Sequence, residues 1–588
     1  MVDPKFEHLG KWARARLAVV ALAVLTACGG AKDDAAADSA PELPAAERPS
    51  AEAAARFLTQ ASFGPNAGTI DWVQRHGYAA WINGQMAVPQ ARHGAYVDAI
   101  KQSLAATNGS NTQSHFIESF WAQAVAGNDQ LRQRAAFALS QVFVISFADA
   151  NLSNRIAGVT SYYDMLGEKA FGNYRDLLES VTLHPMMGLY LTSLRNQKED
   201  GRGRVPDENY AREIMQLFSI GLYQLNNDGT YKLNAAGQPI ETYTHEDIQG
   251  LAKVFTGFSW YAGTTDAART DRRFQGLDGH PDREWRPMQG YPKYHSVSEK
   301  KFLGVTIPAE PRPDPRTEPK GQPERDLAIA LDTLFEHPNV GPFMAQLLIQ
   351  RLVTSNPSPA YVGRVASAFN DNGRGERGDM GAVFKAILLD TEARNPNLAD
   401  PTYGKVREPV LRLSSLLRAF DATSKSGRFL GIDSTDSTVT RLGQTPMRSP
   451  SVFNFFRPGY TPAGSAAADA NLVSPELQLA NEVSVAGYLN YIRGSWLPSS
   501  TTRDINPNFT AAAAMAEDVP KLLDHIDLML MSGQMSPTLR TQLTTAVEGR
   551  AIPRATATNQ RDVDNAKLDR VRIAVLLAMG SADYLIQK

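Results

Sequence analysis

Apolar residues recur every three to four positions along most of the chain after residue 53. This spacing places apolar side chains on one face of an α-helix, so it predicts a mainly helical protein. The predicted helices cover residues 53–58, 70–75, 115–126, 130–147, 174–181, 327–335, 341–353, 381–389, 410–420, 521–531 and 567–579. We therefore expect a mainly α fold, in which many helices form a globular body.

Alternating segments that would predict β-strands are sparse. The best candidate is the stretch 222–244, where the turn dipeptide Asp228-Gly229 lies between short alternating segments and predicts one short β-hairpin. Two long irregular loops, 262–325 and 422–450, separate the helical parts. The first is too long for an ordinary connection, so we expect it to be either a functional loop or a poorly ordered one.

The N-terminus has the pattern of an export signal. Basic residues precede an apolar run at 17–25, which is too short to span a bilayer as a helix. The run is followed by Cys28, the single cysteine of the 588 residues. This pattern resembles the bacterial lipoprotein signal, which is cleaved before a cysteine whose sulfur then carries lipid. The resemblance implies a signal peptide at 1–27, lipidation of Cys28 and export; the alternative is an ordinary secretory signal with an incidental cysteine.

Residues 28–52 are rich in alanine, proline and acids and have no apolar period. Such a segment buries too little surface to offset the entropy of ordering, so we expect a flexible tether between a membrane anchor and a body at 53–588. Gly29 follows the cysteine, where an aspartate tends to retain lipoproteins at the inner membrane, so an outer-membrane address is favoured. No later apolar run approaches transmembrane length.

Composition and charge exclude several function classes. The 60 basic and 62 acidic residues give a formal net charge of −2, so no nucleic-acid partner is expected. A single cysteine excludes an intramolecular disulfide framework and every metal site that needs two thiolates. The sequence has no GxSxG nucleophile elbow, no GxGxxG or P-loop phosphate motif and no CxxCH haem motif. A chain of this length fills two domains or one elaborated domain.

The segment PDENYAREIMQLFSIGLYQL at 206–225 carries the most chemistry. A helix is expected to begin there, because the proline ends any preceding helix and Asp207 can accept hydrogen bonds from the free N–H groups that follow. On this helix Asn209, Glu213 and Gln216 share one flank. That flank presents an amide beside a carboxylate, which suits a metal ligand or an acid–base role. The alternative is that Glu213 is a surface or paired carboxylate.

A second helix is predicted to begin at Thr244, with Asp247 three residues later as in a capping box. The predicted hairpin is short enough to bring this helix back beside the first. Asp247 therefore has two interpretations. It is either a metal ligand near Glu213 or an acid that complements the dipole of its own helix.

Eight sequence blocks occur in an order that resembles one bacterial family, domain of unknown function 1800 (DUF1800). The blocks are AARFLTQASFGP (54–65), HPMMGLYLTSLRN (184–196), ENYAREIMQLFSIG (208–221), YTHEDIQGLAKVFTGF (243–258), HSVSEKKFLG (295–304), HPNVGPFMAQLLIQRLV (337–353), KVREPVLRLSSLLRAF (405–420) and LGQTPMRSPSVFNFFRPGY (442–460). The resemblance covers about residues 52–585 and implies a large, mainly helical, mostly exported protein without an assigned activity. One position departs from the family pattern: Ser296 follows His295 where the family usually has an aspartate.

Histidines supply further candidate metal ligands. Four of them lie in or beside these blocks: His184, His245, His295 and His337. Neutral imidazoles together with a carboxylate suit a divalent ion such as zinc or manganese. No HExxH spacing is present, so distant segments must assemble any such site. The histidines that precede a proline also fit a plain loop-to-helix junction. The metal ligands that we predict are Glu213, His295, His337 and Asp247, with Glu213 and His295 as the catalytic residues.

Other residues are candidates for substrate binding. Arg212, like Lys301 and Arg351, could neutralise an anionic transition state, although long basic side chains often only pair with nearby acids. Trp260 and Tyr294 belong to an aromatic group in and beside the first irregular loop. These rings either line a pocket for a ring-bearing ligand or pin the loop to the body.

Two functions from different classes remain. The first is a membrane-anchored, metal-dependent hydrolase that acts on a small-molecule substrate, such as an organophosphate triester or another phosphoester. The resemblance contributes the organophosphate part of this hypothesis. The second is a non-catalytic surface or scaffold lipoprotein, in which the sequence blocks are structural helix junctions. Neither hypothesis fixes an oligomeric state.

Overall fold

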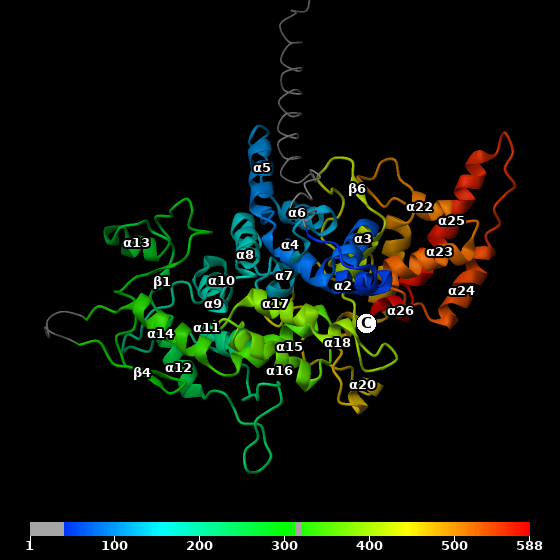
Figure 1. Ribbon diagram of the computed structural model, residues 1–588. Coiled ribbons are helices and arrows are strands. Elements are labelled where there is room, and N and C mark those ends of the chain that lie inside the picture. The colour runs from blue at the N-terminus through cyan, green and yellow to red at the C-terminus, as the bar shows by residue number, and fades with distance from the viewer. Residues whose placement is uncertain (1–39, 312–318) are drawn as a thin grey trace, which may run out of the picture.

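The computed structural model describes residues 40–311 and 319–588 and is mainly α-helical (Figure 1). This confirms the mainly α fold that the apolar spacing predicts. In Figure 1 the N-terminal helices, drawn in blue, lie near the middle of the molecule, and the C-terminal helices, drawn in orange and red, lie on one side. The predicted signal peptide and Cys28 lie outside the described residues.

The helices up to residue 190 are mostly joined by short connections, and longer segments precede the helices Asn209–Glu213 and His245–Val254. The helices up to residue 254 are α2 (Ala51–Ala61), α3 (Ala67–His76), α4 (Tyr78–Ala87), α5 (His93–Ala105), α6 (Gln113–Ala126), α7 (Gln130–Ser140), α8 (Ile156–Lys169), α9 (Tyr174–Leu183), α10 (Pro185–Tyr190), α11 (Asn209–Glu213), the π-helix η3 (Ile214–Ser219) and α12 (His245–Val254). A short 3-10 turn, η2 (Ala45–Glu47), precedes them.

The later helices are interrupted by longer irregular segments. They are η4 (Asp266–Ala268), α13 (Asp271–Phe274), α14 (Pro323–Glu336), α15 (Val340–Leu352), α16 (Pro359–Asn370), α17 (Met380–Leu389), α18 (Thr391–Arg394), α19 (Pro409–Ala419), α20 (Ala466–Asp469), η5 (Pro475–Leu479), α21 (Glu482–Tyr491), the π-helix η6 (Ile492–Trp496), α22 (Thr510–Ala514), α23 (Val519–Ile526), the π-helix η7 (Asp527–Met531), α24 (Pro537–Glu548), α25 (Gln560–Met579) and α26 (Ala582–Leu585).

The strands of the described residues are short and pair two by two in antiparallel fashion. The pairs are β1 (Phe258–Ser259) with β2 (Gln289–Gly290), β3 (Lys300–Phe302) with β4 (Val305–Ile307), β5 (Lys405–Val406) with β8 (Ile586–Gln587), and β6 (Thr423–Ser424) with β7 (Ile505–Asn506). In the expected hairpin region, isolated bridges join Tyr223 to Glu241, Leu225 to Tyr231 and Leu233 to Pro239. This region therefore makes two reversals, where the sequence predicts one.

One cluster of buried apolar side chains extends from Ala54 in α2 to Tyr584 in α26. Because both ends of the body contribute to it, the helices share one core. A second, small cluster of Ala262, Phe274 and Tyr291 lies in the irregular stretch 262–325. These three side chains attach part of the stretch to the body, while most residues between 264 and 287 are exposed or half-buried.

Residues 42–48 contact α3, although the sequence places them in the tether. The N–H of Leu43 donates to the carbonyl oxygen of Arg75 at 2.7 Å, and Glu42 pairs with Arg48 and Arg75. α2 then begins at Ala51, before the predicted boundary of the body at 53. Within residues 40–311 and 319–588, no helix is long and apolar enough to cross a membrane.

Candidate functional site

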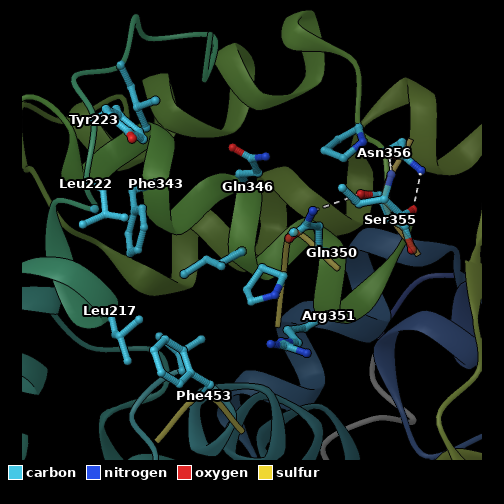
Figure 2. Close-up of a pocket in the computed structure, with 18 of the residues that line it drawn as sticks. Leu217, Leu222, Tyr223, Phe343, Gln346, Gln350, Arg351, Ser355, Asn356 and Phe453 are labelled. Carbon is cyan, nitrogen blue, oxygen red and sulfur yellow. Dashed lines mark hydrogen bonds between the residues drawn. The ribbon is translucent and has the colours of Figure 1, made fainter. Parts of the chain in front are cut away.

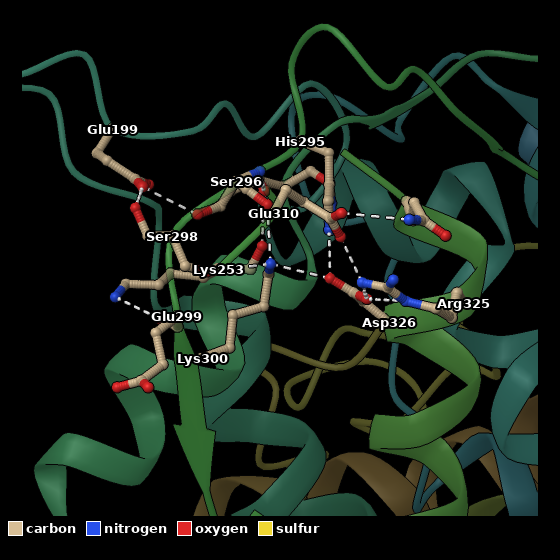
Figure 3. A network of polar contacts seen from close by, with 12 residues as sticks. Glu199, Lys253, His295, Ser296, Ser298, Glu299, Lys300, Glu310, Arg325 and Asp326 are labelled. Atoms are coloured by element: carbon tan, nitrogen blue, oxygen red, sulfur yellow. Dashed lines mark hydrogen bonds and ion pairs between the residues drawn. The ribbon is translucent and has the colours of Figure 1, made fainter. Parts of the chain in front are cut away.

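His295 is fully buried just before β3, at the centre of a polar network (Figure 3). Its Nδ1 lies 2.8 Å from the carbonyl oxygen of Thr256, and its Nε2 lies 3.0 Å from Oδ2 of Asp326. Both partners are hydrogen-bond acceptors. While these contacts hold, both ring nitrogens are occupied, and neither is open to a metal ion or a substrate.

Asp326, in the first turn of α14, joins this network to two cations. Nζ of Lys300 lies 2.9 Å from Oδ2, and Arg325 donates to Oδ1 from Nε at 2.9 Å and from Nη2 at 2.7 Å. Burial alone would raise the pKa of Asp326. The hydrogen bonds from His295, Lys300 and Arg325 outweigh burial and hold that pKa well below its ordinary value. The network is a closed charge cluster between α14 and β3.

Ser296 stands where the family resemblance leads us to expect an aspartate. Its Oγ donates to Oε1 of Glu199 at 3.0 Å, and its N–H donates to Oγ1 of Thr256 at 2.8 Å. Ser298 also donates to Glu199. An aspartate at position 296 would put a second carboxylate beside that of Glu199. In this chain the site instead holds one carboxylate, from Glu199, and the neutral hydroxyl of Ser296 that donates to it.

Glu213 is the last residue of α11 and is 8% exposed. Its Oε2 is buried and has no hydrogen-bond partner, and burial raises the pKa of the carboxyl group. The next residues form the π-helix η3, in which the N–H groups of Ile220 and Gly221 both donate to the carbonyl oxygen of Met215. The wider turn breaks the predicted helical spacing that would put Glu213 and Gln216 on one flank. Gln216 lines a cavity, and Glu213 is not among the residues that line it.

The other two predicted metal ligands have structural partners. Oδ2 of Asp247 accepts hydrogen bonds from N and Oγ1 of Thr244 at 2.7 and 2.9 Å, which is the predicted capping box. Its Oδ1 accepts from the N–H of Leu303 at 2.6 Å. Nδ1 of His337 accepts from the N–H of Asn339 at 3.1 Å, and burial lowers the pKa of His337 to about 4.

The structure thus places Glu213, His295, His337 and Asp247 in four different surroundings. In the part of the chain that is described, no three His, Cys, Asp or Glu side chains are arranged to hold a metal ion. The metal site predicted from these four residues is therefore not assembled in this conformation.

The three predicted substrate-binding residues also have other partners. Arg212 is half-buried, and its guanidinium lies 3.6 Å from the carboxylate of Glu208. Trp260 is buried, with the guanidinium groups of two arginines over its ring. The ring of Tyr294 stacks on Phe274 with 3.7 Å between centroids. The aromatic side chains of this region therefore pack the irregular stretch, which is the second of the two interpretations above.

A cavity of about 740 Å³ lies elsewhere, between η3 and the residues that follow it, α15, and segment 452–473, which includes α20 (Figure 2). It is lined by Gln141, Val142, Gln216, Leu217, Gly221, Leu222, Tyr223, Leu225, Tyr231, Phe343, Gln346, Leu347, Gln350, Arg351, Ser355, Asn356, Pro357, Val452, Phe453, Pro458, Gly459, Asn471, Leu472 and Val473. The lining combines apolar side chains with several side-chain amides. No carboxylate is among these lining residues.

Backbone geometry keeps this cavity open. Gly221 has a φ of +69°, and a Cβ atom at this position would lie 3.0 Å from the ring of Phe343. On the opposite wall, Nδ2 of Asn356 donates to the carbonyl oxygen of Val473 at 3.0 Å, and Oδ1 of Asn356 accepts from the Val473 N–H at 2.9 Å. This pair of bonds joins the segment after α15 to segment 452–473.

Sequence reasoning missed the amide residues of this cavity. A signal was present: Gln346, Gln350 and Arg351 interrupt an otherwise apolar helix, VGPFMAQLLIQRL. Polar residues at this spacing on a buried helix indicate a wet or liganded face.

Comparison with known proteins gives one match. The family model described as "Protein of unknown function (DUF1800)" matches residues 56–586. No curated protein and no solved structure was found to match the chain.

Proposed function

The chain belongs to the DUF1800 family, and we propose that it is a lipid-anchored envelope protein that binds a small molecule in the cavity beside α15. The observation that carries this proposal is the cavity itself. Its volume of about 740 Å³ is within the range of small-molecule sites, and its apolar walls with a few fixed polar groups are typical of them. The anchor rests on the lipoprotein pattern that ends at Cys28.

A substitution that fills the cavity with a large side chain tests the binding proposal. Gln346 lines the cavity from α15, so Gln346→Trp places a large ring inside it. We expect the full chain in nanodiscs to give a saturation-transfer NMR signal with 4-phenylbutanamide, and Gln346→Trp to lose it. Gln102→Trp, on the exposed end of α5, is the matched control and should keep the signal. An equal signal from wild type and Gln346→Trp, after subtraction of empty nanodiscs, would overturn the proposal.

Hydrolysis is a second candidate function, and the observation that favours it is Glu213. A buried carboxyl group with an unpartnered oxygen and a raised pKa has the character of a general acid or base. We expect the chain loaded with Zn²⁺ or Mn²⁺ to hydrolyse an aryl phosphotriester, and Glu213→Gln to remove that activity. Elemental analysis of the purified protein reports any bound metal. Activity that is absent with both ions, or that Glu213→Gln retains, would reject this candidate.

A further inference from the structure

Arg351 lies at the wall of the cavity and has no anionic partner among the described residues. Its side chain is buried, with 4% exposure, and its Nε makes no hydrogen bond. The guanidinium lies over the ring of Phe456, 4.6 Å from the centroid. A buried guanidinium is normally paired with a carboxylate, because removing it from water costs several kcal/mol. Arg351 therefore has unused capacity to bind an anion.

The two carboxylates whose field reaches Arg351, Glu408 and Glu476, have other partners, although each keeps one oxygen without a hydrogen bond. Oε2 of Glu408 accepts hydrogen bonds from Nε2 of Gln141 at 2.7 Å and of Gln444 at 2.6 Å. Oε1 of Glu476 lies 2.9 Å from Nζ of Lys405, in an ion pair with 1% exposure on both sides. Both glutamates act on Arg351 only through their electrostatic field. Neither of them neutralises it by direct contact.

Positive charge is in excess behind the cavity wall. The carbonyl oxygen of Arg351 accepts hydrogen bonds from Nη2 of Arg134 at 2.7 Å and from Nζ of Lys405 at 3.0 Å. Three cations, namely these two and Arg351, thus face the two carboxylates Glu408 and Glu476. Burial lowers the pKa of Arg134 to about 10, which shows how strongly this layer is shielded from water. An incoming anion would balance the remaining charge.

The remaining walls of the cavity are arranged for a molecule with two different ends. Ser355 lines the same cavity, and its Oγ has no hydrogen-bond partner. Leu217, Phe343 and Phe453 supply apolar surface in the same cavity (Figure 2). Polar capacity and apolar surface therefore meet in one space.

We propose that the ligand of this cavity is a small amphipathic organic anion. Its acidic group pairs with Arg351, and its apolar part packs against Leu217, Phe343 and Phe453. This inference rests on the proposed function, since it names the ligand class of the same cavity.

A matched pair of probes tests the charge preference. 4-Phenylbutanoate and 4-phenylbutanamide have the same size and apolar part and differ in charge. A charge-assisted hydrogen bond contributes about 1.5 kcal/mol or more, so we expect the full chain to bind the carboxylate about tenfold more tightly or better. Saturation-transfer NMR titration in nanodiscs measures both dissociation constants. Competition between the probes shows that they share one site.

Variants then locate the charge. Arg351→Met keeps most of the volume of the side chain and should bring the two dissociation constants within about threefold of each other. Arg351→Lys keeps the charge and should retain a preference for the carboxylate. Arg493→Met, at an exposed arginine outside the cavity lining, is the control and should match wild type. Circular dichroism checks that each variant is folded.

The outcomes separate the two proposals. If neither probe binds to wild type, the proposed binding function fails. If both bind wild type equally, the function stands and the anion inference is overturned, a comparison that needs no variant. A carboxylate preference that persists in folded Arg351→Met also overturns the inference. Acetate that competes as well as 4-phenylbutanoate would reject the amphipathic ligand in favour of a bare anion.

Discussion

Burial makes the side chain of His184 hard to protonate. Its Nδ1 accepts a hydrogen bond from the N–H of Met186 at 3.2 Å, at the start of α10, and its Nε2 lies 3.2 Å from Oγ of Ser161. Burial lowers the pKa of His184 from 6.5 to about 3. The unfolded chain therefore takes up this proton first, and the folded state loses stability as the pH falls from about 6.5 towards 3.

His184→Asn keeps a capping acceptor at this position and removes the titrating group. Between pH 7 and pH 4.5, we expect wild type to lose about 2–3 kcal/mol more free energy of unfolding than the variant. Urea unfolding followed by circular dichroism at both pH values measures the difference. His245→Asn, at an exposed histidine, should behave as wild type. An acid sensitivity that His184→Asn leaves unchanged would contradict the role of this side chain.

At the scale of one element, Asp247 fixes the beginning of α12 and attaches it to the β3–β4 turn through Leu303. The helix lies so close to β3 that a Cβ atom on Gly250 would be 1.6 Å from the carbonyl oxygen of Lys301. This close packing leaves Asp247 with cap and turn contacts on both carboxylate oxygens. Its role in this conformation is to position the helix.

Asp247→Ala separates a cap from a metal ligand. Loss of these contacts should lower the free energy of unfolding by about 1–2 kcal/mol, because the N–H groups of Thr244 and Leu303 lose their acceptor. Metal content, measured by elemental analysis, should equal that of wild type. Glu246→Ala, at the exposed neighbouring acid, is the control. A variant that keeps its stability and loses bound metal would instead make Asp247 a ligand.

Local signals in the sequence were sufficient for elements whose causes are local. The capping box of Thr244 and Asp247 was predicted, because both partners lie within one turn. The register after Glu213 was not, because a π-helix changes the spacing that the pattern assumes. The apolar pattern at 130–147 also overran α7, which ends at Ser140; Phe147 instead donates its N–H to Met447, 300 positions away.

The candidate sites depend on contacts between distant segments, and this limited their prediction. His295 is held by Thr256 and Asp326, and no local pattern shows that these three residues meet. The cavity draws its walls from η3, α15 and segment 452–473. The helical pattern predicted α15. Which side of that helix faces the cavity depends on how the other two segments pack against it.

At the scale of the whole molecule, the anchor is testable through Cys28. Cys28→Ala removes the sulfur that would carry lipid, so we expect the variant to move from the membrane fraction to the soluble fraction and to lose palmitate labelling. Thr26→Ala keeps a small residue two positions before the cysteine and should remain in the membrane fraction. A Cys28→Ala chain that stays membrane-bound after a high-salt wash would contradict a lipid anchor.

The contact between Leu43 and α3 limits how far the body of an anchored molecule can lie from the membrane. The chain between Cys28, the proposed lipid attachment, and Leu43, which is bound to the body, is the free length of the anchor; each residue-to-residue spacing along it is one step. Fifteen such steps (43 minus 28) span about 50 Å at full extension. An anchored copy would therefore sample a shell of about this depth beside the bilayer, and the molecules it meets are those that diffuse through that shell.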